Sequence, residues 1–206
     1  MRIAVYSGSF NPLHKGHLAI MEKLSEDPSV GWTYLVVSPK NPLKDGISAD
    51  TGRERYRAAI RAVQKYPQLK VWVDDIELGM EPPQYTVRTL DALKAREPGN
   101  DFVLTIGADN LADIRRWRDY SRILTEYGVM VYPREGFDLK AVMTDLKAEN
   151  PDYRIQILDA TKVNISSTAI REALARGEDP GEFLALLAHT KTAPSGTLTA
   201  TQILPP

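Results

Sequence analysis

Short apolar runs alternate with amphipathic helical segments along most of the chain, and this alternation constrains the fold more than any other feature. The runs rich in β-branched and aromatic residues predict strands at 3–6, 32–37, 69–73, 102–106, 129–132 and 155–158. Apolar spacing between them predicts helices at 18–24, 51–66, 86–96 and 139–149. Strands separated by helices pair in parallel, because each helical crossover returns the chain to the same end of the sheet. We therefore expect an α/β fold with a doubly wound parallel sheet of five to six strands.

Polar and glycine-containing segments follow three of the predicted strands. They are residues 8–17 after the first strand, 39–44 after the second and 107–109 after the fourth. In doubly wound sheets, ligands bind beyond the carboxyl ends of the strands, where the strand order reverses. We therefore expect these segments to meet at one ligand site.

Composition narrows the class of protein. With 206 residues, 43% of them hydrophobic, the chain is large enough for one ordinary core. We expect a single domain at 1–189 and a flexible tail at 190–206, which is rich in Thr, Pro, Ser and Gly. The net charge of −1 offers no argument for binding to nucleic acid or to a membrane surface. The absence of cysteine excludes disulfides, thiolate metal sites and cysteine nucleophiles.

The start of the chain lacks the pattern of a signal peptide, and no apolar run approaches the roughly 20 residues of a membrane span. We therefore expect a soluble, cytoplasmic protein. Four arginines, at 53, 55, 57 and 61, cover much of the predicted helix 51–66 outside its apolar face. We expect them to form a solvated face, with at most one turned inward.

The segment from Gly8 to His17 joins the first predicted strand to the first predicted helix. A strand, a glycine-containing turn and a helix N-terminus leave backbone N–H groups facing an anion. His14, Lys15 and His17 add side-chain donors at the same end of the helix. We interpret the segment as a phosphate site, although G-x-G-x-x-G and the P-loop pattern are absent. The alternative for His17 is a structural role, because it shares a helical stripe with apolar residues.

A second segment, Ser166-Ser167-Thr168, stands where another helix is predicted to start. Its hydroxyl and N–H groups can cap that helix or bind an anion. Arg171 lies one turn further on and returns to the same end of the helix. The alternative is a plain N-cap followed by a surface arginine.

Together these two segments resemble the signatures of the nucleotidyltransferase superfamily of Rossmann-like adenylyl- and cytidylyltransferases. Residues 8–17 match the G-x-F-x-P…H-x-G-H signature, and residues 165–171 match I-S-S-T-x-x-R. The resemblance implies a Rossmann-like sheet with a small C-terminal helical portion. It implies that His14, His17 and Arg171 act in catalysis. The ATP-binding residues it implies are Gly8, Ser9, Phe10, His14, His17, Gly107, Asp109, Ile165, Ser167 and Arg171.

Features between the signatures resemble those of nicotinate-mononucleotide adenylyltransferases. Residues 84–90 resemble S-Y-T-x-x-T-L, with Gln84 in place of the usual serine, and 106–117 resemble I-G-x-D-x-L…W. Residues 39–44 resemble the family's proline and lysine loop with a shorter spacing, and 131–136 fit V-x-x-R-x-G. The resemblance fades beyond about residue 175. The mononucleotide-binding residues it implies are Lys44, Tyr85, Thr86, Asp109 and Trp117.

We expect the indole of Trp117 to stack on the pyridine ring. A packing role for Trp117, and helix capping by Thr86 and Asp109, remain the alternatives.

The resemblance implies that ATP and nicotinate mononucleotide are joined to give deamido-NAD and pyrophosphate, a step of NAD biosynthesis. The attacking phosphate has a second pKa of about 6 and is charged at neutral pH, so no general base is needed. We expect Mg²⁺ to be held by the triphosphate, because no carboxylate cluster provides protein ligands. The oligomeric state stays open, a homo-oligomer included. Alternatives are a nicotinamide-mononucleotide, phosphopantetheine or sugar-phosphate acceptor, and a non-catalytic nucleotide sensor.

Overall fold

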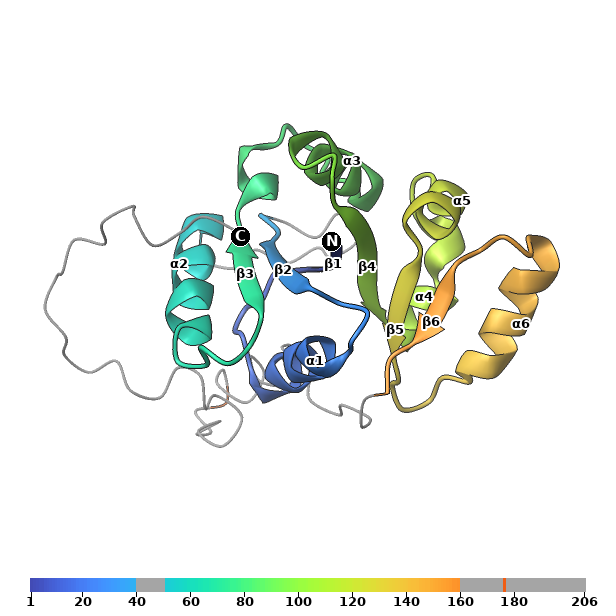
Figure 1. Ribbon diagram of the computed structural model, residues 1–206, viewed down its shortest axis with the longest axis horizontal. Helices are drawn as coiled ribbons and strands as arrows, with labels where there is room; N and C mark the ends of the chain where they lie inside the picture. The colour runs from blue at the N-terminus through green and yellow to red at the C-terminus, as the bar shows by residue number, and fades with distance from the viewer. Residues whose placement is uncertain (40–50, 160–175, 177–206) are drawn as a thin grey trace, which may run out of the picture.

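The computed structural model describes residues 1–39, 51–159 and 176, and these form a six-stranded sheet with helices on both faces (Figure 1). The strand order is β3-β2-β1-β4-β5-β6, and each neighbouring pair is parallel. The predicted doubly wound parallel sheet is confirmed, with six strands. Their bounds are β1 Arg2–Gly8, β2 Trp32–Val37, β3 Val71–Asp74, β4 Asp101–Gly107, β5 Val129–Tyr132 and β6 Ile155–Ile157.

Four longer helices connect the strands, close to the predicted positions. They are α1 Lys15–Glu26, α2 Gly52–Val63, α3 Thr86–Arg96 and α6 Leu139–Glu149. Five short helical turns were not predicted: η1 Ile76–Gly79, α4 Ala108–Ala112, η2 Ile114–Arg116, α5 Tyr120–Arg122 and η3 Ile123–Tyr127. The cap of α2 shows why its start is readable from sequence. Thr51 Oγ1 accepts from the Glu54 N–H at 3.2 Å, and Glu54 Oε2 accepts from the Thr51 N–H at 2.7 Å.

Helices cover both faces of the sheet, so successive residues of a strand pack into the cores on opposite faces. Ile3 and Val5 of β1 pack with α3, α4 and α6 on one face of the sheet. Ala4 and Tyr6 pack with α1 and α2 on the other. Because β1 is buried on both faces, its sequence is a continuous apolar run.

Several predicted features lie outside the described residues. They are Lys44 in the loop after β2, the segment with Ile165, Ser167 and Arg171, the domain boundary at 189 and the tail at 190–206. Within the described ranges, no helix has the length and apolar character that a membrane crossing needs.

Candidate active site

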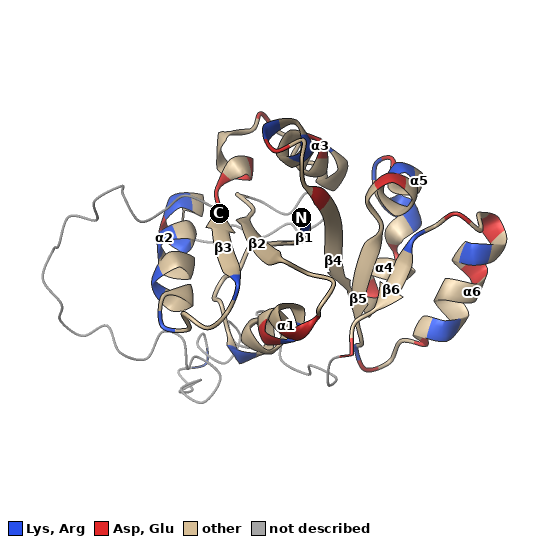
Figure 2. Cartoon of the chain, viewed as in Figure 1, with Lys and Arg blue, Asp and Glu red and all other residues tan. Residues whose placement is uncertain are grey.

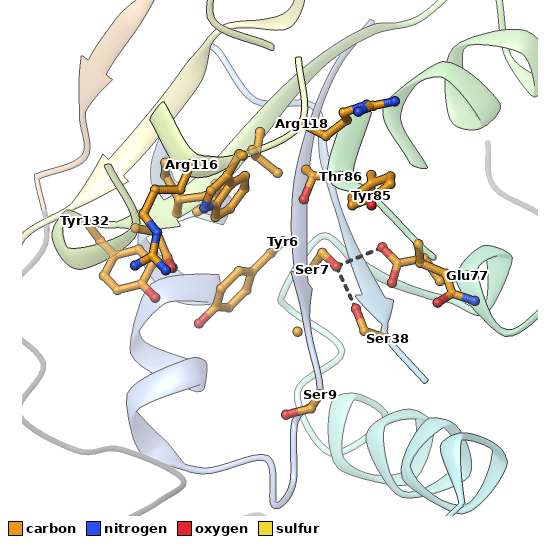
Figure 3. A pocket seen from close by; sticks show the side chains of 17 residues that line it. Tyr6, Ser7, Ser9, Ser38, Glu77, Tyr85, Thr86, Arg116, Arg118 and Tyr132 are labelled. Atoms are coloured by element: carbon orange, nitrogen blue, oxygen red, sulfur yellow. Dashed lines mark hydrogen bonds between the residues drawn. The ribbon is translucent and has the colours of Figure 1, made fainter. Parts of the chain in front are cut away.

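A pocket lies at the carboxyl ends of the strands, where the strand order reverses between β1 and β4. Its walls come from the ends of β1 and β2, from β4 and β5, from η1 and the start of α3, and from residues 116–118. Figure 3 shows the side chains that line it. The expectation that the segments after β1 and β4 lie at one edge of the sheet is confirmed by the parallel pairing of these two strands.

The chain turns sharply where β1 ends, through Gly8, Ser9 and Phe10. Phe10 has a φ of 44°, in the left-handed region, and it is buried with its ring edge-on to Tyr6 at a centroid distance of 5.4 Å. A non-glycine residue in this conformation costs about 1–3 kcal/mol, so surrounding packing must hold it. A Cβ on Gly8 would lie 3.2 Å from the Phe10 ring, so a larger residue there would press on the ring that the turn buries.

Arg55 of α2 ties this turn to the end of β2. Its Nη1 donates to the carbonyl oxygens of Ser9 at 2.5 Å and of Ser38 at 2.8 Å, and its Nη2 donates to that of Pro39 at 2.8 Å. Arg55 is buried, whereas Arg53 and Arg57 are exposed, and Figure 2 shows the basic residues spread along α2. The prediction that at most one arginine of this helix turns inward is confirmed.

His14 and His17 stack on each other at the N-terminus of α1. Their ring centroids are 3.7 Å apart with an interplanar angle of 28°. The backbone N–H of His14 donates to Nδ1 of His17 at 3.2 Å, so the neutral His17 ring carries its proton on Nε2. His14 is 2% exposed, and neither of its ring nitrogens has a hydrogen-bond partner among the described residues. Buried polar atoms without partners are costly, so they are available for a ligand.

Both imidazoles are held neutral at pH 7. Burial, and to a smaller extent the Arg134 guanidinium, lowers the pKa of His14 from 6.5 to about 4. Burial lowers the pKa of His17 well below its usual value, and His14 and Arg134 lower it further. In the absence of ligand the pair therefore presents N–H donors rather than positive charges.

Asp109 and Arg134 form the far side of this cluster. Asp109 Oδ1 and Arg134 Nε are 3.3 Å apart, without the alignment of a hydrogen bond. Gly107 stands at the N-terminus of α4 beside them, and a Cβ there would lie 2.3 Å from Asp109 Oδ1. Only a glycine allows the carboxylate this position. Asp109 lies beside Arg134 and is not part of the pocket wall, which its neighbour Asn110 helps to form.

Tyr85, Thr86 and Trp117 share the pocket. Tyr85 and Thr86 begin α3, and Trp117 directly follows η2. The indole is partly buried against the core, and its Nε1 has no hydrogen-bond partner among the described residues. The Arg118 guanidinium lies 5.8 Å from the centre of the Tyr85 ring. Of the predicted mononucleotide residues, Tyr85, Thr86 and Trp117 therefore meet in one pocket with an aromatic wall, Asp109 does not line it, and Lys44 lies outside the described residues.

The sequence model of the family described as Cytidylyltransferase-like matches residues 5–173. A Bacteroides fragilis protein described as "Probable nicotinate-nucleotide adenylyltransferase" is 37% identical over 183 residues, which cover 89% of this chain and 87% of that protein. A Flavobacterium johnsoniae protein with the same description is 36% identical over 179 residues, covering 87% and 89%. The chain belongs to the nicotinate-nucleotide adenylyltransferase family.

The fold agrees with this family. The structure of the Plasmodium falciparum nicotinic acid mononucleotide adenylyltransferase complexed with NaAD superposes with a TM-score of 0.70 over 86% of each chain, at 20% identity. At this identity the likeness concerns the fold alone. The resemblance to nicotinate-mononucleotide adenylyltransferases drawn from the sequence motifs is confirmed by the curated relatives.

Several polar residues that line the pocket do not stand out in the sequence. Arg116 and Arg118 flank Trp117, and Ser7, Ser38 and Glu77 form a polar cluster in the pocket wall (Figure 3). A basic-aromatic-basic triplet could have drawn attention to the two arginines. Nothing in the sequence marks Glu77, because the turn that carries it has no helical period. In the described part of the chain, no three His, Asp or Glu side chains gather as metal ligands.

Proposed function

We propose that this chain transfers the adenylyl group of ATP to nicotinate mononucleotide, giving deamido-NAD and pyrophosphate. The observation that supports this most is the pocket shared by Trp117 and the Tyr85-Thr86 helix start. The stacked histidines do not line this pocket but lie beside it, since the ring of its lining residue Tyr6 is 6.1 Å from that of His17. An indole suits stacking on a pyridine ring, and helix N-termini bind anions. The curated relatives have the matching name.

The chemical step we propose is a direct in-line displacement. A phosphate oxygen of the mononucleotide attacks the α-phosphorus of ATP, and the bond from that phosphorus to the pyrophosphate oxygen breaks. The attacking group is charged at neutral pH, so the enzyme needs no base to activate it. The protein aligns two anions and stabilises the charge that develops on the α-phosphate and the leaving group.

His14 and His17 are the described donors best placed for this task. His17 offers its Nε2–H, and the unpartnered ring nitrogens of buried His14 gain a partner when phosphate oxygens arrive. A nearby polyanion raises the pKa of an imidazole, so phosphate binding favours the charged form that the empty site disfavours. Arg171, with the N–H group of Ser167, is the predicted cationic partner from outside the described residues.

Mg²⁺ enters this proposal as part of the substrate Mg–ATP. Its ligands are triphosphate oxygens and water, because the described residues offer no cluster of metal ligands. Asp109 is held by Arg134 and sits close to the histidines' end of the site, where it is placed to accept from a ribose hydroxyl. These assignments separate an ATP half of the site from a mononucleotide half around Trp117.

A side-by-side turnover assay tests the proposal. Purified protein is incubated with Mg–ATP and either the acid or the amide mononucleotide, and dinucleotide is measured by chromatography. We expect pyrophosphate release that depends on the acceptor and favours the acid. Dinucleotide formation with equal or reversed preference would contradict the acid assignment, and absence of dinucleotide from both would contradict the proposed function.

A further inference from the structure

Glu77 is a buried carboxylate in the pocket wall, and the mechanism above gives it no task. It lies in η1, and the residue is 3% exposed although it lines the same pocket as Trp117. Removing an ionised carboxylate from water is expensive unless partners compensate for the lost solvation. The partners of Glu77 therefore indicate what the site is arranged to hold.

Hydroxyl groups fix the position of the Glu77 carboxylate. Its Oε1 accepts from Ser7 Oγ at 3.1 Å and from Thr89 Oγ1 at 2.9 Å. Ser7 Oγ also lies 3.0 Å from Ser38 Oγ, so the cluster ties η1 to the ends of β1 and β2 (Figure 3). Hydrogen bonds donated to a carboxylate favour its ionised form. The fold thus provides donors suited to a negative charge.

No cation within residues 1–39 and 51–159 forms an ion pair with Glu77. The neighbouring buried carboxylate, Asp74, has its own partner in Arg96 at 2.6 Å. Burial raises the pKa of Glu77, the hydroxyl donors oppose the rise, and the like charge of Asp74 adds to it. A buried negative charge that faces a pocket and lacks a cation is suited to a positively charged ligand.

The pyridine nitrogen of the acceptor in the proposed function carries such a charge, while the ring carboxylate of the acid is left to the N-terminus of α3. Ribose attached to the pyridine nitrogen makes the ring a pyridinium, in the acid and in the amide alike. Phosphopantetheine and sugar phosphates, which could undergo the same phosphate chemistry, have no cationic ring. A ring stacked on Trp117 would lie in the pocket that Glu77 lines.

We propose that Glu77 is a specificity-determining residue that selects acceptors with an N-substituted pyridinium ring by charge. The inference rests on the proposed function, because that function places the ring in this pocket. Attraction between opposite charges extends over several ångströms in a partly desolvated site, so direct contact with the ring is not required. Serine and threonine hydroxyls hold the carboxylate, while the pyridinium supplies the missing positive charge.

The test compares the oxidised mononucleotide with its 1,4-dihydropyridine form, which keeps the ribose phosphate but has a neutral ring. kcat/KM is measured for both forms in mildly alkaline buffer. In Glu77→Gln we expect kcat/KM for the pyridinium form to fall about 10-fold or more, and for the neutral form less than about 2-fold. The KM for ATP should stay unchanged. Glu81→Gln is the matched control, since Glu81 is an exposed carboxylate of the next turn that does not line the pocket.

Equal losses for the two ring forms in Glu77→Gln would overturn the inference and leave Glu77 with a structural role. If Glu77→Gln fails to fold, Glu77→Asp decides. Retained preference for the pyridinium form supports selection by charge, and lost preference in the folded variant overturns it. Absence of dinucleotide from the wild-type protein with either form would instead contradict the proposed function.

Discussion

The stacked histidines make the stability of the protein depend on pH in a way that can be calculated. His14 is neutral in the folded state because burial lowers its pKa to about 4, whereas the unfolded chain titrates at the ordinary value of 6.5. As pH falls below 6.5, His14 becomes protonated in the unfolded state but stays neutral in the folded state. The free energy of unfolding therefore decreases as pH falls, and the contribution of His14 is fully present above pH 6.5.

With these two pKa values, His14 alone lowers the free energy of unfolding by about 2 kcal/mol between pH 7 and pH 5. The loss would approach a limit of about 3.4 kcal/mol below the folded-state pKa, which corresponds to the full separation of the two values. His17 adds to it in the same direction, because its pKa is also lowered by burial. The two histidines therefore lower the free energy of unfolding of the ligand-free protein in mild acid.

Urea unfolding of the ligand-free protein at pH 7 and pH 5 measures this effect, with His14→Gln as the comparison. Carboxylates that titrate in this range affect both proteins equally, so the difference between them isolates the imidazole. We expect the wild-type protein to lose about 2 kcal/mol more than the variant between the two pH values. If both proteins lose the same free energy of unfolding between the two pH values, with unchanged dependence on denaturant, His14 is not held neutral by burial.

Three further substitutions test separate parts of the site. Arg55→Lys removes most of the hydrogen bonds to three backbone carbonyls and should lower the free energy of unfolding by about 2–4 kcal/mol in urea titrations. A loss below about 1 kcal/mol would contradict a stabilising role for these hydrogen bonds. Gly107→Ala forces Asp109 to move and crowds Tyr132 and Arg134, so it should raise the KM for ATP and lower thermal stability. An unchanged KM for ATP in the folded variant would exclude a close role for Asp109. Trp117→Ala should raise the KM for the mononucleotide about 10-fold while leaving that for ATP within about 2-fold, and equal changes would remove the stacking hypothesis.

The regular elements of the fold were predictable because local signals and tertiary structure agree. The bounds of β2, β5, α3 and α6 match the predicted ranges 32–37, 129–132, 86–96 and 139–149. Each has a clear apolar period, and turn or capping residues mark most of their ends. The short turns between 108 and 127 were missed, because three to five residues are too few for a helical period to appear.

Site residues that belong to a sequence motif could be predicted, whereas those positioned by contacts between separate elements could not. The histidines, Tyr85 and Trp117 were named from their motifs. Which arginine of α2 turns inward could not be predicted, because Arg55 is buried by carbonyls from the ends of β1 and β2. Glu77 is held by a hydroxyl of β1, which lies 70 residues away, and by one of α3, which lies 12 residues away, and neither contact is marked in the sequence.

The central position of β1 has a consequence for synthesis on the ribosome. Its first neighbour, β2, follows within 30 residues, but β4, which covers its other edge, pairs Phe102 with Ile3 about one hundred residues later. At about 5–20 residues per second, that edge stays open for roughly 5–20 s while the chain emerges. An open, apolar strand edge is a template for pairing with other chains. On the nascent chain, the β4 edge of β1 therefore stays exposed to pairing with other chains until β4 has emerged.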